Sequence, residues 1–184
     1  MLKLKEKYQD QVISEMEKEF DYDNPMAVPQ IKKVVVSTSF GSQSEDWSKP
    51  EEARQEIEND IATITGQKPV LQRAQQSVAE FHVREGDPVG FKVTLRGNRM
   101  FDFLERLVYL ALPRSKDFKG IKPKSLDQQG NLNIGFEDQS AFPEISTEQE
   151  KTFFGVQITI VTSTSNRSES LSLFKKLGFP FKEE

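Results

Sequence analysis

The chain has 184 residues, with 25 lysines and arginines, 29 aspartates and glutamates, one histidine and no cysteine. This length fits one domain that can bury a core without disulfides or metal. The absence of cysteine excludes disulfide scaffolds, thiolate-bound zinc, iron–sulfur clusters and thiol nucleophiles. No apolar run approaches the ~20 residues of a membrane helix. Met1–Asp10 is too charged for a signal peptide, so we expect no membrane partner and a cytoplasm-like compartment.

The charge of the chain is unevenly distributed. Although the net charge is −4, residues 66–126 carry a net charge of +6 and the remainder carries −10. A basic segment on an acidic body is the footprint expected for a polyanion partner such as a nucleic acid. Ordinary surface variation gives the same pattern, so charge alone leaves both interpretations open.

The N-terminal part of the chain predicts a helix, a linker and a strand. Leu2–Phe20 has helical spacing of its apolar residues, which are Leu4, Tyr8, Val12, Met16 and Phe20. Asp21–Pro29 holds two prolines and indicates a linker. Ile31–Val36 is rich in β-branched residues and predicts a strand, which we expect to end in a small polar loop at Ser37–Ser42.

A second helix and an antiparallel pair of strands follow. Ser48–Glu51 has the pattern of a helix start, and Gly66 suits the helix end. Val78–Arg84 and Val89–Arg96 predict two paired strands around a turn. In the second strand Val89, Phe91, Val93 and Leu95 alternate with Gly90, Lys92, Thr94 and Arg96. The second set is therefore expected on a solvent-exposed sheet face, where it can hydrogen-bond phosphates and riboses.

The C-terminal half predicts a helix, a basic loop, a hairpin, a strand and a final helix. Asn98 is expected to cap a helix over Arg99–Leu112 that ends at Pro113. The segment Pro113–Lys124, here called the basic loop, combines five cations with two prolines and a glycine. The remaining expected elements are a hairpin arm at 132–136, a strand at 154–160 and a helix near 167–177, whose inward residues are Leu171, Phe174 and Leu177.

These elements predict an α+β fold: a mostly antiparallel sheet with helices packed on one face and the other face partly exposed for RNA binding. We expect residues 1–184 to form a single domain. Its expected parts are an N-terminal helix (2–20), a core of sheet and helices (31–112), a basic loop with hairpin arm (113–142) and a C-terminal strand and helix (153–178).

Motifs for catalysis and cofactor binding are missing from the sequence. It contains no phosphate-binding loop, no dinucleotide fingerprint, no zinc-protease motif and no nucleophile elbow. His82 is the single possible imidazole base and is expected in a strand without an orienting carboxylate. We therefore predict a binding protein with no catalytic residue, no metal and no cofactor.

Several ordered motifs carry a family resemblance across nearly the whole chain. They include Gly66–Val70, Arg73–Ala79, Phe81–Gly86, Lys92–Met100, Leu112–Gly120, Phe142–Ile145 and Leu177–Phe181. With Tyr8 and Val28–Lys33, the chain resembles the bacterial-type ribosomal large-subunit protein five family, which binds 5S rRNA. The resemblance implies an RNA-binding α+β protein that attaches 5S rRNA in the central protuberance of the large subunit. It leaves open whether the ribosome is cytoplasmic or organellar.

The resemblance also implies site residues and partners. The rRNA-binding positions are Ser37, Gln67, Lys68, Lys92, Thr94 and Arg96, and the loop facing P-site tRNA holds Arg73, Gln75, Gln76 and Ser77. A bridge to small-subunit protein thirteen, or a contact with an RNA backbone, is placed at Arg114, Lys116, Lys119 and Lys122. Other 5S-associated large-subunit proteins are further implied partners.

The sequence departs from the family pattern at the RNA-facing positions. Ser37 stands where the family usually has an asparagine, and Gln75 and Gln76 stand where it usually has two lysines. Glu80 replaces a usual glycine, and the sequence pI of about 5.3 is low for the family. The loss of two cations at Gln75 and Gln76 and the gain of an anion at Glu80 weaken the expected tRNA contact most. They also motivate an alternative, an off-ribosome module of the same fold that binds protein.

Overall fold

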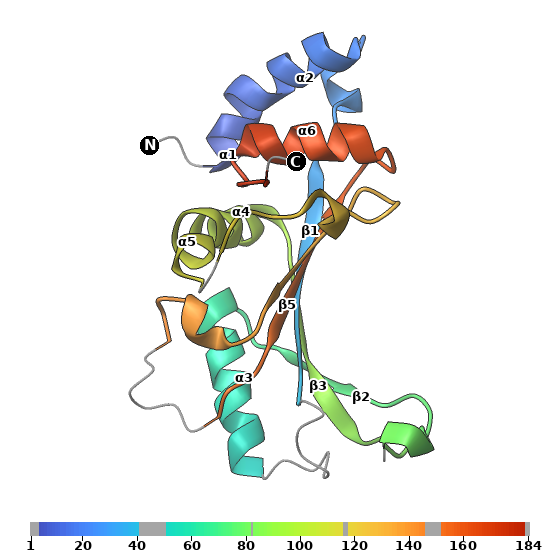
Figure 1. Cartoon of the computed structure of the whole chain (residues 1–184), viewed down its shortest axis with the longest axis vertical. Helices are drawn as coiled ribbons and strands as arrows, with labels where there is room; N and C mark the ends of the chain where they lie inside the picture. The colour runs from blue at the N-terminus through green and yellow to red at the C-terminus, as the bar shows by residue number, and fades with distance from the viewer. Residues whose placement is uncertain (1–3, 41–50, 82, 116–117, 146–151, 183–184) are drawn as a thin grey trace. The chain divides into compact units, whose positions relative to one another are not determined.

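The computed structural model describes residues 4–40, 51–81, 83–115, 118–145 and 152–182 (Figure 1). Its α-helical and π-helical segments are α1 (Leu4–Lys7), the π-helix η1 (Tyr8–Val12), α2 (Ile13–Phe20), α3 (Glu51–Thr65), α4 (Gly97–Arg106), the π-helix η4 (Leu107–Ala111), α5 (Leu112–Arg114) and α6 (Arg167–Leu177). The strands are β1 (Ile31–Ser39), β2 (Val70–Arg73), β3 (Pro88–Leu95), β4 (Leu132–Phe136) and β5 (Val156–Thr162). Short 3-10 helices occur at Pro25–Ala27, Ala79–Phe81, Pro123–Ser125 and Gln139–Ala141.

The strands form one five-stranded antiparallel sheet in the order β2-β3-β1-β5-β4. Together with the helices, this sheet confirms the predicted α+β class. The chain divides into two compact units. Unit 1 comprises Met1–Val34, Leu95–Ile134 and Thr159–Glu184, and unit 2 comprises Val35–Thr94 and Gly135–Ile158.

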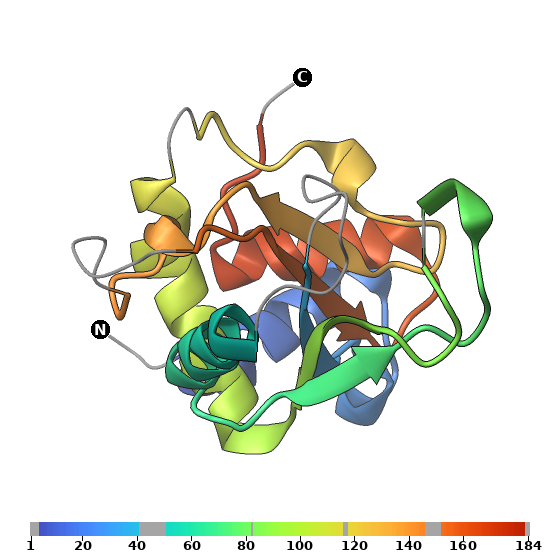
Figure 2. The same ribbon diagram turned by 90° about the horizontal axis from the view of Figure 1, so that it is seen from below.

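In unit 2 the strands bury one face and leave the other partly open. Val36, Thr38 and Phe40 are buried, whereas the residues between them are not. Phe40 packs edge-on against Phe91 of β3, with ring centroids 5.4 Å apart. The helix α3 lies beside these strands and buries Ile57, Ile61 and Ile64 (Figures 1 and 2).

Two expectations for unit 2 are wrong. The predicted loop from Ser37 begins too early, because β1 continues to Ser39 and the buried hydroxyl of Thr38 donates to the carbonyl of Gly155 at 2.7 Å. The partner of β3 is β2 rather than Val78–Arg84, since Val70 pairs with Lys92. Residues 78 and 83 form an isolated bridge in the β2–β3 connection, which projects at the right of Figure 2.

In unit 1 the predicted N-terminal helix runs over Leu4–Phe20 with a π-helical segment at its middle. Its apolar residues repeat every four positions, which exceeds the 3.6 residues of an α-helical turn. The wider turn of η1 compensates for this difference, so that Leu4, Val12 and Met16 are all buried. The helix α2 packs against α6, and the two lie side by side at the top of Figure 1.

Three further expectations for unit 1 need correction. Arg96, not Asn98, is the N-cap residue of α4, and the amide oxygen of Asn98 accepts a hydrogen bond from Lys5 instead. On α6 the fully buried leucine beside Phe174 is Leu173, whereas Leu171 is half-buried. The helix predicted to end at Pro113 continues to Arg114 as α5. Residues 132–136 form an edge strand of the main sheet, and an antiparallel bridge joins its first residue, Leu132, to Leu126.

Some expected features lie outside the described residues. They are the helix start at 48–50, His82 and Lys116. None of the helices that the structure describes is long and apolar enough to cross a membrane.

Candidate nucleic-acid interface

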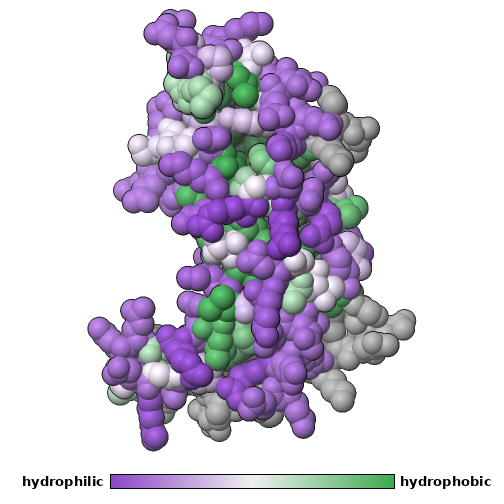
Figure 3. Space-filling view, turned by 180° about the vertical axis from the view of Figure 1, so that it is seen from behind, coloured by the Kyte–Doolittle hydropathy of each residue, from purple (hydrophilic) through white to green (hydrophobic). Residues whose placement is uncertain are grey.

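The open face of the sheet in unit 2 is polar. It carries the residues of β1 and β3 that alternate with the buried ones, together with one residue of β5. These partly or fully exposed residues are Val35, Ser37, Ser39, Lys92, Thr94 and Gln157. Hydrophilic side chains also predominate in Figure 3, where apolar residues show in smaller patches. The predicted exposure of Lys92 and Thr94 is therefore observed.

Gln67 and Thr94 are brought together although 27 positions separate them. Gly66 ends α3 with a φ of 67°, a conformation that glycine adopts readily, and turns the chain toward β3. The side-chain amide of Gln67 then donates to the backbone carbonyl of Thr94 at 3.4 Å. The hydroxyl of Thr65 also donates to the carbonyl of Gln67 at 3.0 Å. Gln67 is thus held at the edge of the open face.

Lys92 contributes a cation to this face, whereas Lys68 follows Gln67 and contacts α3. The ammonium group of Lys68 lies 3.2 Å from a carboxylate oxygen of Glu58 and remains highly exposed, with 84% of its side chain accessible. An ion pair at such exposure is weak and can exchange for a phosphate. Lys92 lies opposite Val70 in the β2–β3 register, and Val70 is itself 63% exposed. The expectation that Gly90 lies on the exposed face is wrong. Gly90 is buried, and the backbone of β1 lies so close to it that a Cβ there would be 2.1 Å from the carbonyl oxygen of Thr38.

Arg96 belongs to unit 1 and follows β3 directly. It occupies the N-cap position of α4 with extended backbone angles, φ −142° and ψ 164°, and its side chain is exposed. Within the described part of the chain it forms no ion pair. A guanidinium held free of carboxylates can bind a phosphate in bidentate fashion.

The β2–β3 connection in unit 2 is closed by its own hydrogen bonds. The guanidinium of Arg73 donates to the carbonyl of Gly86 at 2.9 Å, and the hydroxyl of Ser77 accepts from the amide of Glu85 at 3.0 Å. One hydrogen bond of the Arg73 guanidinium is therefore made within the connection itself. All four predicted tRNA-facing side chains, Arg73, Gln75, Gln76 and Ser77, are exposed.

The cations of the basic loop lie in unit 1. Arg114 is exposed at the end of α5, and Lys119 and Lys122 are exposed in the irregular segment after it. The structure thus places the predicted residues in three separate regions: the open face with Arg96 after it, the β2–β3 connection and the basic loop.

Sequence reasoning missed Ser39 and Gln157 on the open face. The signal for Gln157 is its alternation with the buried Val156 and Ile158 in β5. Ser39 falls in the segment predicted as a loop, where the alternation of buried and exposed strand residues does not apply. Both residues extend the row of hydroxyl and amide groups on this face.

The chemistry of these groups is that of binding. Hydroxyl, amide and cationic side chains can hydrogen-bond riboses, base edges and phosphates. Within the residues that the structure describes, no three histidine, aspartate or glutamate side chains are close enough to hold a metal ion. The fold and the site define a polar binding surface on an α+β protein.

Comparisons with known proteins identify the family. The family model for the C-terminus of ribosomal protein L5 matches residues 88–181, and the model described as Ribosomal protein L5 matches residues 24–84. The large ribosomal subunit protein uL5 of Bifidobacterium longum (strain DJO10A) is 50% identical over 181 residues, 98% of this chain and 93% of the relative. The uL5 protein of Halothermothrix orenii is 46% identical over 180 residues, 98% of each chain. The chain belongs to the L5 (uL5) family of large ribosomal subunit proteins.

Family membership confirms the resemblance to the ribosomal large-subunit protein five family and the prediction that the chain is not an enzyme. The protein is a structural component of the large ribosomal subunit and acts in translation as part of a ribonucleoprotein. Ribosomes of bacteria are cytoplasmic, in agreement with the predicted localisation.

Proposed function

We propose that this chain binds 5S rRNA and helps to attach it in the central protuberance of the large subunit. The observation that carries the proposal is the juxtaposition of Gln67 with Thr94 at the edge of an open, polar sheet face. Two of the six rRNA-binding positions implied by the family resemblance thereby come together. Another of the six, Arg96, follows two residues later in the chain.

The open face suits folded RNA because its groups match sugar and phosphate chemistry. The hydroxyls of Ser37 and Thr94 can donate to or accept from ribose 2′-hydroxyls. Lys92 supplies a point charge for phosphates on this face, and outside it Lys68 supplies a second point charge and Arg96 of unit 1 a planar fork. The exposed Val70 beside Lys92 offers an apolar surface for a sugar or a base.

We further propose that Arg73–Ser77 contacts P-site tRNA and that the basic loop contacts small-subunit protein thirteen or an RNA backbone. The exposure of Gln75, Gln76, Lys119 and Lys122 supports these assignments. Other 5S-associated large-subunit proteins are expected neighbours of the same particle.

The test measures 5S rRNA binding by Lys92→Ala and Arg96→Ala chains. Each substitution is expected to weaken binding by about 1–3 kcal/mol and to lower the salt slope by about one phosphate contact. Lys18→Ala is the matched control, since it removes an exposed cation of α2 far from these positions in the sequence. Circular dichroism verifies that all variants are folded.

Unchanged affinity in the folded Lys92→Ala and Arg96→Ala chains would show that this face is not the 5S interface. Association that is insensitive to salt and independent of RNA would instead favour the off-ribosome protein-binding module. Retention of 5S rRNA from total RNA by the parent chain supports the proposal.

A further inference from the structure

The C-terminal segment Phe179–Lys182 is joined to the basic loop by backbone hydrogen bonds in unit 1. The amide of Ile121 donates to the carbonyl of Pro180 at 2.7 Å, and the amide of Lys182 donates to the carbonyl of Ile121 at 2.9 Å. Ile121 and Phe181 thus form a parallel bridge although 60 positions separate them in the chain. These two hydrogen bonds therefore hold the backbone of the basic loop in place at Ile121.

Gly120 makes this close approach possible. Its φ of 98° lies in the region that glycine tolerates and other residues avoid. A Cβ at this position would lie 2.9 Å from the amide nitrogen of Lys182 and 3.1 Å from its Cα. A side chain on residue 120 would therefore displace the C-terminal segment from the loop.

The helix α6 fixes both partners of this contact. Gly178 ends the helix in the left-handed conformation, and the ring of the buried Phe179 packs edge-on against Phe174 at 5.2 Å. At the start of the same helix, the guanidinium of Arg167 donates to the carbonyl of Pro123 at 2.9 Å. The loop is held near residue 121 by the C-terminal segment and at Pro123 by Arg167.

The joined segments present lysines to solvent. Lys119, Lys122 and Lys124 of the basic loop and Lys182 of the C-terminal segment are all exposed. Among residues that the structure describes, none of these four lysines forms an ion pair. The backbone bridge places Lys182 beside Gly120, the residue that follows Lys119 and lies two positions before Lys122 in the sequence.

We propose that Lys119, Lys122 and Lys182 form one composite surface that binds the phosphate backbone of ribosomal RNA, with the C-terminal segment as an integral part. The inference rests on the proposed function and adds Lys182 and Gly120 to its RNA-facing residues. Lysines on irregular backbone bind phosphates as point charges without reading sequence. We therefore expect this surface to bind a stretch of RNA backbone without selecting particular bases.

The experiment measures 5S rRNA affinity over a range of salt concentrations for the parent chain and its variants. Lys182→Ala is expected to lower affinity about fivefold and the salt slope by about one unit. Lys122→Ala is expected to act similarly, whereas the control Lys18→Ala is expected to leave both values unchanged.

Gly120→Ala tests the role of the bridge. We expect it to lower affinity about as much as Lys182→Ala, with no further loss in the Gly120→Ala/Lys182→Ala double variant, because both changes remove the same lysine from the surface. Hydrogen exchange at the amides of Ile121 and Lys182 reports whether the bridge has opened.

The outcomes separate this inference from the proposed function. Binding by the parent with no loss in Lys182→Ala overturns the inference alone. Equal losses in Lys182→Ala and Lys18→Ala also overturn it, since they indicate a diffuse charge effect. A parent chain that does not bind 5S rRNA overturns the proposed function and this inference with it.

Discussion

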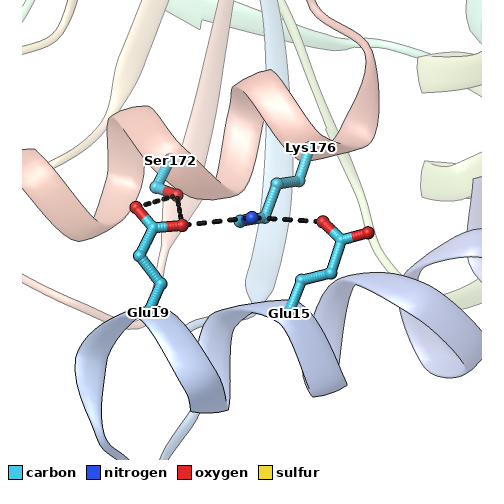
Figure 4. Close-up of polar contacts among 4 residues, drawn as sticks. All are labelled: Glu15, Glu19, Ser172 and Lys176. Carbon is cyan, nitrogen blue, oxygen red and sulfur yellow. Dashed lines mark hydrogen bonds and ion pairs between the residues drawn. The ribbon is translucent and has the colours of Figure 1, made fainter.

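Lys176 of α6 forms an ion pair with Glu19 of α2, with 3.1 Å between its ammonium nitrogen and the carboxylate oxygen Oε2 of Glu19 (Figure 4). The same ammonium lies 3.1 Å from Oε2 of Glu15. The hydroxyl of Ser172 donates to both carboxylate oxygens of Glu19, at 2.8 and 2.9 Å. These contacts join the N-terminal and C-terminal helices of unit 1.

Lys176→Ala is expected to destabilise the protein by up to about 1 kcal/mol, because partly exposed ion pairs contribute little in water. For a chain of this size the melting temperature is expected to fall by about 2–4 °C per kcal/mol. Thermal unfolding followed by circular dichroism measures the change. Lys175→Ala is the matched control, since Lys175 is exposed and has no ion pair within the described residues.

The contact between α2 and α6 is expected to weaken in acid. The hydrogen bonds from Ser172 and Lys176 lower the pKa of the Glu19 carboxyl below its ordinary value of 4.5. A lowered pKa in the folded state means that the stabilisation is present above the unfolded pKa and is lost as pH falls through the folded pKa. Chemical denaturation at about pH 7 and about pH 3 measures this loss.

Glu19→Gln removes the titrating group and is the control for the acid effect. Its stability is expected to change less between the two pH values than that of the parent. An identical pH dependence in parent and variant would mean that Glu19 does not link these helices in solution.

Gly90→Ala is expected to destabilise the protein by about 1–3 kcal/mol, because the added methyl group meets the backbone oxygen of Thr38 at 2.1 Å. Gly135→Ala is the matched strand control, since a Cβ there has no neighbour within 4 Å. Urea denaturation compares the two. A Gly90→Ala chain as stable as the Gly135→Ala chain would contradict the close approach of β1 and β3.

The sequence predicts elements best where periodicity and a terminating residue agree. The final helix is an example, because the apolar spacing and Gly178 give the observed bounds Arg167–Leu177. The prediction of a strand at Val78–Arg84 is wrong. The local residue pattern there is that of a strand, but β3 pairs with Val70–Arg73, and this pairing depends on a non-local register that the pattern does not specify. Parity in β3 located Lys92 and Thr94, but the contact of Gln67 with Thr94 requires the fold.

Thr94→Val is expected to lower 5S rRNA affinity by about 0.5–1.5 kcal/mol, because it removes a hydroxyl from the open face. The fold is expected to be retained, since valine favours strands and Gln67 bonds to the backbone carbonyl of residue 94, which stays. Filter binding and thermal unfolding measure the two effects. Thr63→Val, which removes an exposed hydroxyl from α3, is the control, and equal affinities in both variants would contradict a role for Thr94.

The double variant Gln75→Lys/Gln76→Lys is expected to bind tRNA more tightly than the parent. Both side chains are exposed in the β2–β3 connection, and the family resemblance places lysines at these two positions. Each lysine that reaches a phosphate is expected to steepen the salt dependence by about one unit. Fluorescence anisotropy with labelled tRNA measures affinity and slope.

The matched control for the tRNA experiment is Gln128→Lys/Gln129→Lys, which adds the same charge at two exposed glutamines of unit 1. A larger gain at positions 75 and 76 than at 128 and 129 supports a tRNA-facing role for the β2–β3 connection. Equal gains would attribute the effect to net charge, because the added lysines would then act wherever they are placed.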